Sequence, residues 1–139
     1  MLAWCWGVTR RSVGRSEEGV PPEGKGRKGS GMGYQDYIVR FADVEWQSPG
    51  EFMRHKVFDC GAQRMRVMEL QRGMQHPEWC PKGHAGYILE GKLSLEFEDG
   101  TVVLGPGDAF LVPSGTAAQH RPTPATDRLV MVLVESVGR

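Results

Sequence analysis

The sequence predicts an all-β domain, built as a sandwich or barrel of short antiparallel strands. Three observations favour this fold class. Glycine and proline are abundant, with 19 and 9 residues among 139, as is typical of a protein with many turns. Short apolar or alternating segments are separated by turn sequences at regular intervals. No segment carries the long 3.6-residue apolar period of an amphipathic helix.

The first half of the domain is expected to contain three strands, at residues 37–41, 55–59 and 64–70. A turn is expected at Ser48-Pro49-Gly50, because proline and glycine favour turns. The third strand alternates loosely, so two sets of side chains should face opposite ways. One set is Met65, Val67 and Glu69, and the other is Arg66, Met68 and Leu70.

Four further strands are expected at residues 86–89, 93–97, 101–104 and 109–112. The second of these has a clear period of two, with Leu93, Leu95 and Phe97 on one face. The turns between them fall at Glu90-Gly91, Asp99-Gly100 and Gly105-Pro106-Gly107-Asp108. Residues 129–134 form a fully apolar run rich in β-branched side chains, which predicts a central buried strand.

Residues 1–31 differ from the rest of the chain. From Thr9 to Gly31 there is almost no apolar content, so this segment cannot bury enough surface to offset its ordering entropy. We predict a disordered or non-native extension at 1–31 and a single β-barrel domain at 32–139. Lys28-Gly29 could be encoded by a purine-rich stretch ahead of the Met32 codon, which suggests that translation naturally starts at Met32.

Composition excludes several classes of function. The 17 basic and 17 acidic residues balance, which gives no general electrostatic reason to bind nucleic acid or an acidic membrane. No apolar segment approaches the ~18 residues of a membrane span. Cys5, Cys60 and Cys80 are an odd number of cysteines and do not suggest a disulfide framework, so the expected location is the reducing cytoplasm.

Residues 78–120 carry the candidate site. Glu78 and Cys80 are two residues apart, so on an extended strand they would share a face. Pro81-Lys82-Gly83 would turn the chain and return His84 beside them, and His120 follows later. One carboxylate, one thiol and two imidazoles are suitable ligands for zinc or iron(II), whereas a thiolate argues against magnesium and calcium. If Glu78 is not a ligand, it is the candidate catalytic base.

Two segments, Gly86–Leu93 and Gly105–Gly115, resemble the motifs of the cupin superfamily over about residues 63 to 136. The resemblance implies a small antiparallel jelly-roll barrel, often dimeric, with a divalent metal near the barrel mouth. The turn glycines and prolines match the family's pattern, and the ligands depart from it. Counted back from Gly91, His84 takes the usual glutamate position, and Glu78 and Cys80 take the usual pair of histidines.

The remaining ligand is displaced too. The second motif should carry a histidine at the position of Ala118, and the nearest one is His120, two residues later. A two-residue offset returns a strand side chain to the same face, so His120 could still point inward.

Other roles for these residues stay open at this point. Cys80 could be a small buried side chain or a reactive thiolate activated by His84. Glu78 could be a rim carboxylate paired with Arg121 or Lys82, His84 a core histidine bonded to backbone, and His120 a solvent-loop residue. His76 is a fallback ligand. The other pocket candidates are Met68, Trp79, Tyr87, Phe110 and Met131.

Three functions compete. The first is a metal-dependent cupin that acts on, or senses, a small organic molecule. The second is a metal-free binder of a small-molecule ligand. The third is a self-association or interaction module that uses Trp79 and an exposed sheet. In all three we expect a homodimer, because edge strands of small barrels are commonly paired across subunits.

Overall fold

The computed structural model describes residues 33–137. The predicted extension at 1–31, with Cys5, lies outside these residues. The described part of the chain consists of nine strands and three short 3-10 helices. The strands are β1 Gln47–Gly50, β2 Met53–Cys60, β3 Gln63–Gln71, β4 His84–Glu90, β5 Leu93–Phe97, β6 Gly100–Leu104, β7 Ala109–Val112, β8 His120–Pro124 and β9 Arg128–Ser136. The all-β prediction is confirmed.

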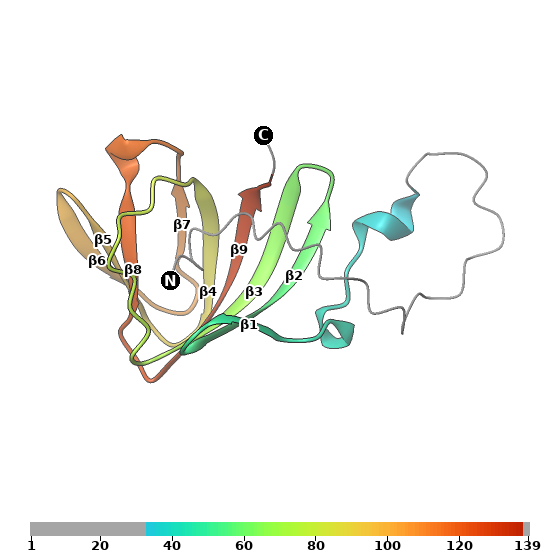
Figure 1. Ribbon diagram of the computed structural model, residues 1–139, viewed down its shortest axis with the longest axis horizontal. Helices are drawn as coiled ribbons and strands as arrows, with labels where there is room; N and C mark the ends of the chain where they lie inside the picture. The colour runs from blue at the N-terminus through green and yellow to red at the C-terminus, as the bar shows by residue number, and fades with distance from the viewer. Residues whose placement is uncertain (1–32, 138–139) are drawn as a thin grey trace.

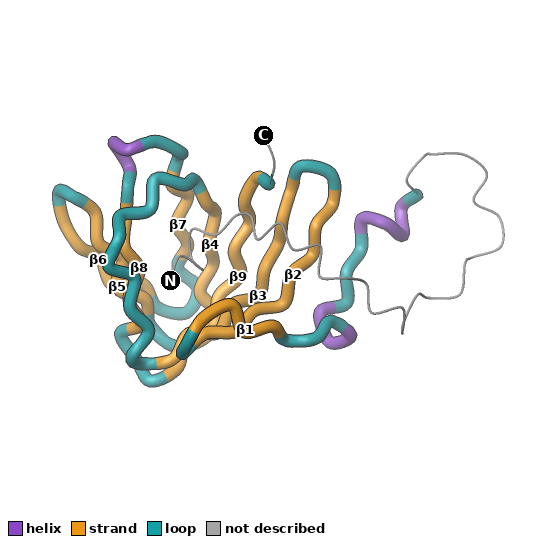
Figure 2. Tube along the Cα trace, viewed as in Figure 1, coloured by secondary structure: helices purple, strands orange, loops and turns teal. Residues whose placement is uncertain are grey.

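The strands form two antiparallel sheets. The larger has the order β1-β2-β3-β9-β4-β7 and the smaller the order β6-β5-β8. Figures 1 and 2 show the small sheet standing opposite the β4 and β7 end of the large one, with loops crossing between them. This double-sheet arrangement is a jelly-roll barrel, as the sequence resemblance implied.

Strand β9 lies inside the large sheet and pairs with β3 over its whole length, from Gln71↔Arg128 to Gln63↔Ser136. It also pairs with β4 on its other side, which confirms the predicted central strand. Its inward face carries three fully buried leucine and methionine side chains, Leu129, Met131 and Leu133. Because side chains alternate along a strand, the next residue on that face is Glu135, which is also buried.

Apolar side chains from both sheets fill the space between them. Members from the large sheet include Met68 and Leu70 on β3 and Ile88 on β4, and those from the small sheet are Leu93 and Leu95 on β5. Each buried side chain of this size contributes roughly 1.5–3 kcal/mol to folding. Arg66 belongs to the same alternating set on β3 as Met68 and Leu70, and it is fully buried beside these apolar residues.

Two glycines are required by close approaches of the chain. Gly91 follows β4 with a φ of +77°, and a Cβ there would overlap the carbonyl oxygen of Arg128. At Gly86 a Cβ would overlap the ring of Phe110, which packs across from β7. A side chain at Gly91 would force the backbone at Arg128 to move, and one at Gly86 would displace the ring of Phe110.

Two predicted elements near the start of the domain are wrong. Residues 37–41 are not a strand: 3-10 helices cover Tyr34–Tyr37 and Phe41–Asp43. Ser48-Pro49-Gly50 belongs to β1, and the turn follows at Glu51-Phe52. Residues 37–41 have the composition of a strand, but Tyr37 and Ile38 are more than half exposed and the segment has no partner strand.

Strand β8, like β1, was not predicted as a strand. Strand β8 contains Pro122 and Pro124, which lowered its expected strand propensity. It lies at the edge of the small sheet, where proline is tolerated because one side of the strand needs no partner. None of the helices among residues 33–137 is long and apolar enough to cross a membrane.

Candidate metal centre

Cys80, His84 and His120 come together from three separate elements at one end of the barrel. His84 is the first residue of β4 in the large sheet, and His120 is the first residue of β8 in the small one. Cys80 lies on the segment that joins β3 to β4, in an isolated bridge with His120 of β8. The backbone N–H of Cys80 donates to the carbonyl of His120 at 2.8 Å, and the reverse bond measures 3.1 Å.

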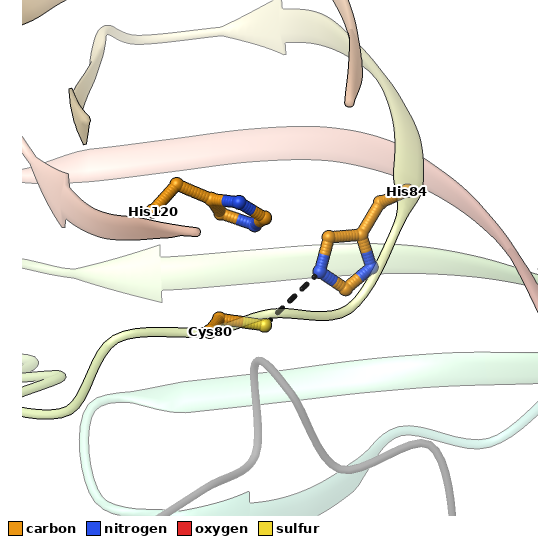
Figure 3. A group of neighbouring side chains, drawn as sticks. All are labelled: Cys80, His84 and His120. Carbon is orange, nitrogen blue, oxygen red and sulfur yellow. Dashed lines mark hydrogen bonds between the residues drawn. The ribbon is translucent and has the colours of Figure 1, made fainter. Parts of the chain in front are cut away.

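The three side chains point toward one another (Figure 3), and all three are buried. Their potential ligand atoms all lie within 4.8 Å of one another. The sulfur of Cys80 is 3.5 Å from Nε2 of His84, close to the ~3.6 Å that separates two ligand atoms on a tetrahedral zinc ion. The two imidazole rings are 5.2 Å apart between centroids and meet edge to face.

The turn between the first two candidate ligands is fixed against a neighbouring loop. The N–H of Gly115 donates to the carbonyl of Pro81 at 2.8 Å, and the N–H of Gly83 donates to the hydroxyl of Ser114 at 3.0 Å. A Cβ at Gly83 would lie 2.8 Å from the backbone nitrogen of Ser114. The turn therefore needs glycine there, and it holds Cys80 and His84 at a fixed separation.

Glu135 orients His84. Its carboxylate oxygen Oε2 lies 3.1 Å from Nδ1 of His84. Burial alone would raise the pKa of Glu135, but the hydrogen bond from His84 and the charges of Arg66 and Lys82 together lower it. The group is thus a carboxylate, which accepts the Nδ1 proton and leaves the lone pair of Nε2 facing Cys80. A carboxylate behind a ligating histidine is a common arrangement in metal sites.

A backbone carbonyl orients His120 in the same way. Nδ1 of His120 donates to the oxygen of Ala118 at 3.0 Å, so Nε2 carries the lone pair. That Nε2 atom is buried and has no hydrogen-bond partner in the described part of the chain. A buried acceptor without a partner costs about 1–3 kcal/mol. Burial lowers the pKa of both His84 and His120, which favours the neutral imidazole that binds metal.

Two cations surround Glu135 as well. Nη2 of Arg66 lies 3.0 Å from Oε1, and neither side chain is exposed. Nζ of Lys82 lies 3.6 Å from Oε2, and the lysine side chain is 23% exposed. Glu135 is therefore the shared partner of the imidazole of His84, one buried guanidinium and one partly exposed ammonium.

The sulfur of Cys80 is disulfide-bonded in the structure. Cys60 is a free thiol. Only a thiolate is a metal ligand, so the donor set of one sulfur and two nitrogens belongs to the reduced protein. In that form the residues fit a transition metal: two neutral imidazoles have fixed tautomers, and one buried nitrogen has no partner.

Glu78, the fourth predicted ligand and the predicted catalytic base, lies outside this group. Its side chain is exposed, and the chain bends at Glu78 instead of running as a strand. The expectation that Glu78 and Cys80 share a face therefore fails, because alternation holds only in an extended strand. The alternative rim pairing of Glu78 is not found among residues 33–137 either, since Arg121 pairs with Glu96 and Lys82 with Glu135.

Other predicted pocket residues have structural roles. Trp79 stacks under the guanidinium of Arg121, which lies 4.2 Å from the ring centroid. Nδ1 of His76 donates to the carbonyl of Glu78 at 2.7 Å, and His76 lies outside the group of converging ligand atoms. Tyr87 is about half exposed, whereas Met68 and Met131 belong to the core.

Sequence reasoning missed Glu135, Arg66 and Lys82 as members of the site. Glu135 could have been recognised from the sequence, because it directly follows the apolar run of the central strand. It is two residues after Leu133, so on a strand both side chains lie on the same face. Arg66 stands in the same alternation as Met68 and Leu70. An acid and an arginine in inward positions of neighbouring strands predict a buried ion pair.

The fold and the site together define a small double-sheet β-barrel with a histidine-rich centre at its open end. The cupin domain model matches residues 66–135, half of the chain, and the chain belongs to the cupin family. Comparison with curated proteins gives no match.

Several solved structures share this fold. An RmlC-like cupin from Shewanella frigidimarina is 16% identical with a TM-score of 0.63, over 74% of this chain and 92% of its own. KdgF from Halomonas sp. is 25% identical with a TM-score of 0.53, over 70% and 92%. The polyketide cyclase RemF from Streptomyces resistomycificus is 24% identical with a TM-score of 0.58, over 73% and 80%.

Proposed function

We propose that this cupin binds one divalent transition metal, zinc or iron(II), through Cys80, His84 and His120, and uses it to act on a small organic molecule. The observation that carries the proposal is the buried Nε2 of His120, which has no partner among the described residues and lies within 4.8 Å of the other two ligand atoms. Burying such an atom is costly unless something binds it.

The chain's own residues prepare the site. Glu135 and the carbonyl of Ala118 fix the tautomers of the two histidines, so that both Nε2 atoms would be the ligands of a bound ion. When bound, the ion would act as a Lewis acid that polarises an oxygen of the substrate or activates a water. Three protein ligands leave a position for that oxygen. Glu78 has no part in this proposal because its side chain is exposed.

Metal content tests the proposal directly. The full chain is purified without chelator and under a phosphine reductant, and its metal is measured by elemental mass spectrometry. We expect about one zinc or iron ion per chain, because the donor set favours these ions. Cys80→Ser and His84→Gln should each lower the affinity at least about tenfold.

Matched controls come from the same residue types elsewhere. Cys60→Ser and His55→Gln change a thiol and an imidazole outside the converging group, so they should keep the metal. A chain without metal under these conditions, which also gains none when zinc or iron(II) is added, would contradict the proposal. Equal loss in the control variants would contradict the assignment of the ligands.

We also propose that the protein is a homodimer. Tyr87 and Leu111 are 48% and 83% exposed, and with Val132 and Val134 they line a shallow apolar groove on the outer face of the large sheet. Exposed apolar patches of this kind favour association. Light scattering should give twice the 15.4 kDa chain mass. Leu111→Glu should produce a monomer, and the control Val103→Glu, on the small sheet, should not.

A further inference from the structure

A row of polar side chains crosses the inner face of the large sheet and ends at the candidate metal centre. Its members are His55 on β2, Arg66 on β3, Glu135 on β9 and His84 on β4. These strands are consecutive neighbours in the sheet. Replacing a buried ion pair by apolar residues of similar size often leaves stability unchanged or raises it. Packing alone therefore does not account for this row.

The contacts pass from one member of the row to the next. Nδ1 of His84 lies 3.1 Å from Oε2 of Glu135. The other oxygen of that carboxylate, Oε1, forms an ion pair with Nη2 of Arg66 at 3.0 Å. The second terminal nitrogen of Arg66, Nη1, lies 3.4 Å from Nδ1 of His55. Since the carboxylate and the guanidinium are both planar, contacts at two atoms fix the orientation of each group.

The far end of the row has a defined protonation state. A guanidinium only donates hydrogen bonds, so Nδ1 of His55 accepts from Arg66. Burial and the charge of Arg66 lower the pKa of His55 to about 4, so near neutral pH the ring is uncharged and its proton is on Nε2. His84 has the opposite tautomer, because its Nδ1 faces the carboxylate of Glu135. The row therefore has an accepting imidazole at one end and a donating one at the other.

We propose that Arg66 and His55 are positioning residues of the metal centre. Arg66 holds the carboxylate of Glu135 in the orientation that fixes the ring of His84, and His55 in turn holds the guanidinium of Arg66. This inference rests on the proposed function, because it needs an ion at the centre, and it adds residues that set the affinity for that ion. His55 is only partly buried, so the row links the centre to a ring near the surface.

The test measures the cobalt(II) affinity of the reduced full chain, from the visible absorption of the bound ion. Arg66→Lys keeps the positive charge but offers one nitrogen in place of two, and it should weaken cobalt binding about tenfold. His55→Leu leaves every charge in place and should weaken binding at least about threefold. His55→Gln keeps a carbonyl acceptor for the guanidinium and should bind like the wild type.

Two comparisons separate positioning from a general loss of structure. Arg54 also pairs with a buried glutamate, Glu69, at 2.6 Å, but both alternate with inward residues and so lie on the outer face of the sheet. Arg54→Lys is therefore the matched control and should keep the wild-type affinity. In a Glu135→Gln background, Arg66→Lys should cause almost no further loss, because the contact through which it acts is already changed.

Heteronuclear NMR of the metal-free, reduced chain observes the row without an ion. At mildly alkaline pH we expect the proton of His55 on Nε2 and that of His84 on Nδ1. The Nδ1 signal of His84 should shift in His55→Leu, although the substitution lies three strands away in the sheet. An unchanged His84 signal, wild-type affinity in Arg66→Lys, or fully additive losses with Glu135→Gln would each overturn this inference alone. A wild-type chain that takes up no cobalt would overturn the proposed function and this inference with it.

Discussion

Replacing Glu135 by glutamine tests how much of the site depends on one carboxylate. The substitution keeps the size of the side chain and removes its charge. Arg66 then faces a neutral amide 3.0 Å away, with neither side chain exposed to water. Removing one partner of a buried ion pair costs about 3–5 kcal/mol. Since glutamine retains one carbonyl acceptor, we expect the lower end of that range, about 3 kcal/mol.

The same substitution should also weaken metal binding. The carboxylate that fixes Nδ1 of His84 is lost, and changes behind a metal ligand typically cost 10–100-fold in affinity. Urea unfolding of the metal-free, reduced protein measures the first effect, and competition with a chromophoric zinc chelator measures the second. Glu96→Gln is the control, because Glu96 forms a surface pair with Arg121 that should be worth less than about 1 kcal/mol. A loss in Glu135→Gln no larger than in this control, with unchanged metal affinity, would refute the reasoning.

Three further predictions concern pH, the turn and the extension. Burial, aided by the charge of Arg66, lowers the pKa of His55 from 6.5 to about 4. Between these two pH values the unfolded chain binds a proton at His55 and the folded chain does not, so the free energy of unfolding should fall as the pH drops from 6.5 to 4. Urea titrations at several pH values should show a smaller fall in His55→Gln. Gly83→Ala should weaken metal binding at least about tenfold while Gly100→Ala does not, because a Cβ at Gly83 meets the backbone of Ser114 and a Cβ at Gly100 meets nothing. A chain that starts at Met32 should unfold at the same urea concentration as the full chain under reductant; aggregation of the shorter chain would show that residues 1–31 are needed.

The sequence predicted the strands that have a clear local pattern, either an alternation of apolar and polar residues or a continuous apolar run. Leu93, Leu95 and Phe97 alternate cleanly, and β5 covers them. The apolar, β-branched run at 129–134 was predicted to be a central buried strand, and β9 pairs on both sides. Residues 37–41 had a similar composition but find no partner strand, and pairing depends on the rest of the fold rather than on local propensity.

The parts of the candidate site that depend on short sequence spacings were predicted from the sequence. The turn Pro81-Lys82-Gly83 returns His84 to Cys80, as expected, and the two-residue offset keeps His120 inward. Glu78 was misplaced because the alternation rule was applied to a segment that bends. Glu135 and Arg66 could not be recognised as one pair, because they are far apart in sequence and meet only through the register Arg66↔Leu133 between β3 and β9.

A crystal structure of the reduced protein, purified without chelator and measured across the zinc and iron absorption edges, tests the metal centre most directly. We expect one anomalous peak bonded to Sγ of Cys80 and to Nε2 of His84 and His120, at about 2.0–2.3 Å from each. Ordered density without any anomalous peak, in a site where Cys80 is a reduced thiol and water bonds to His120, would contradict it.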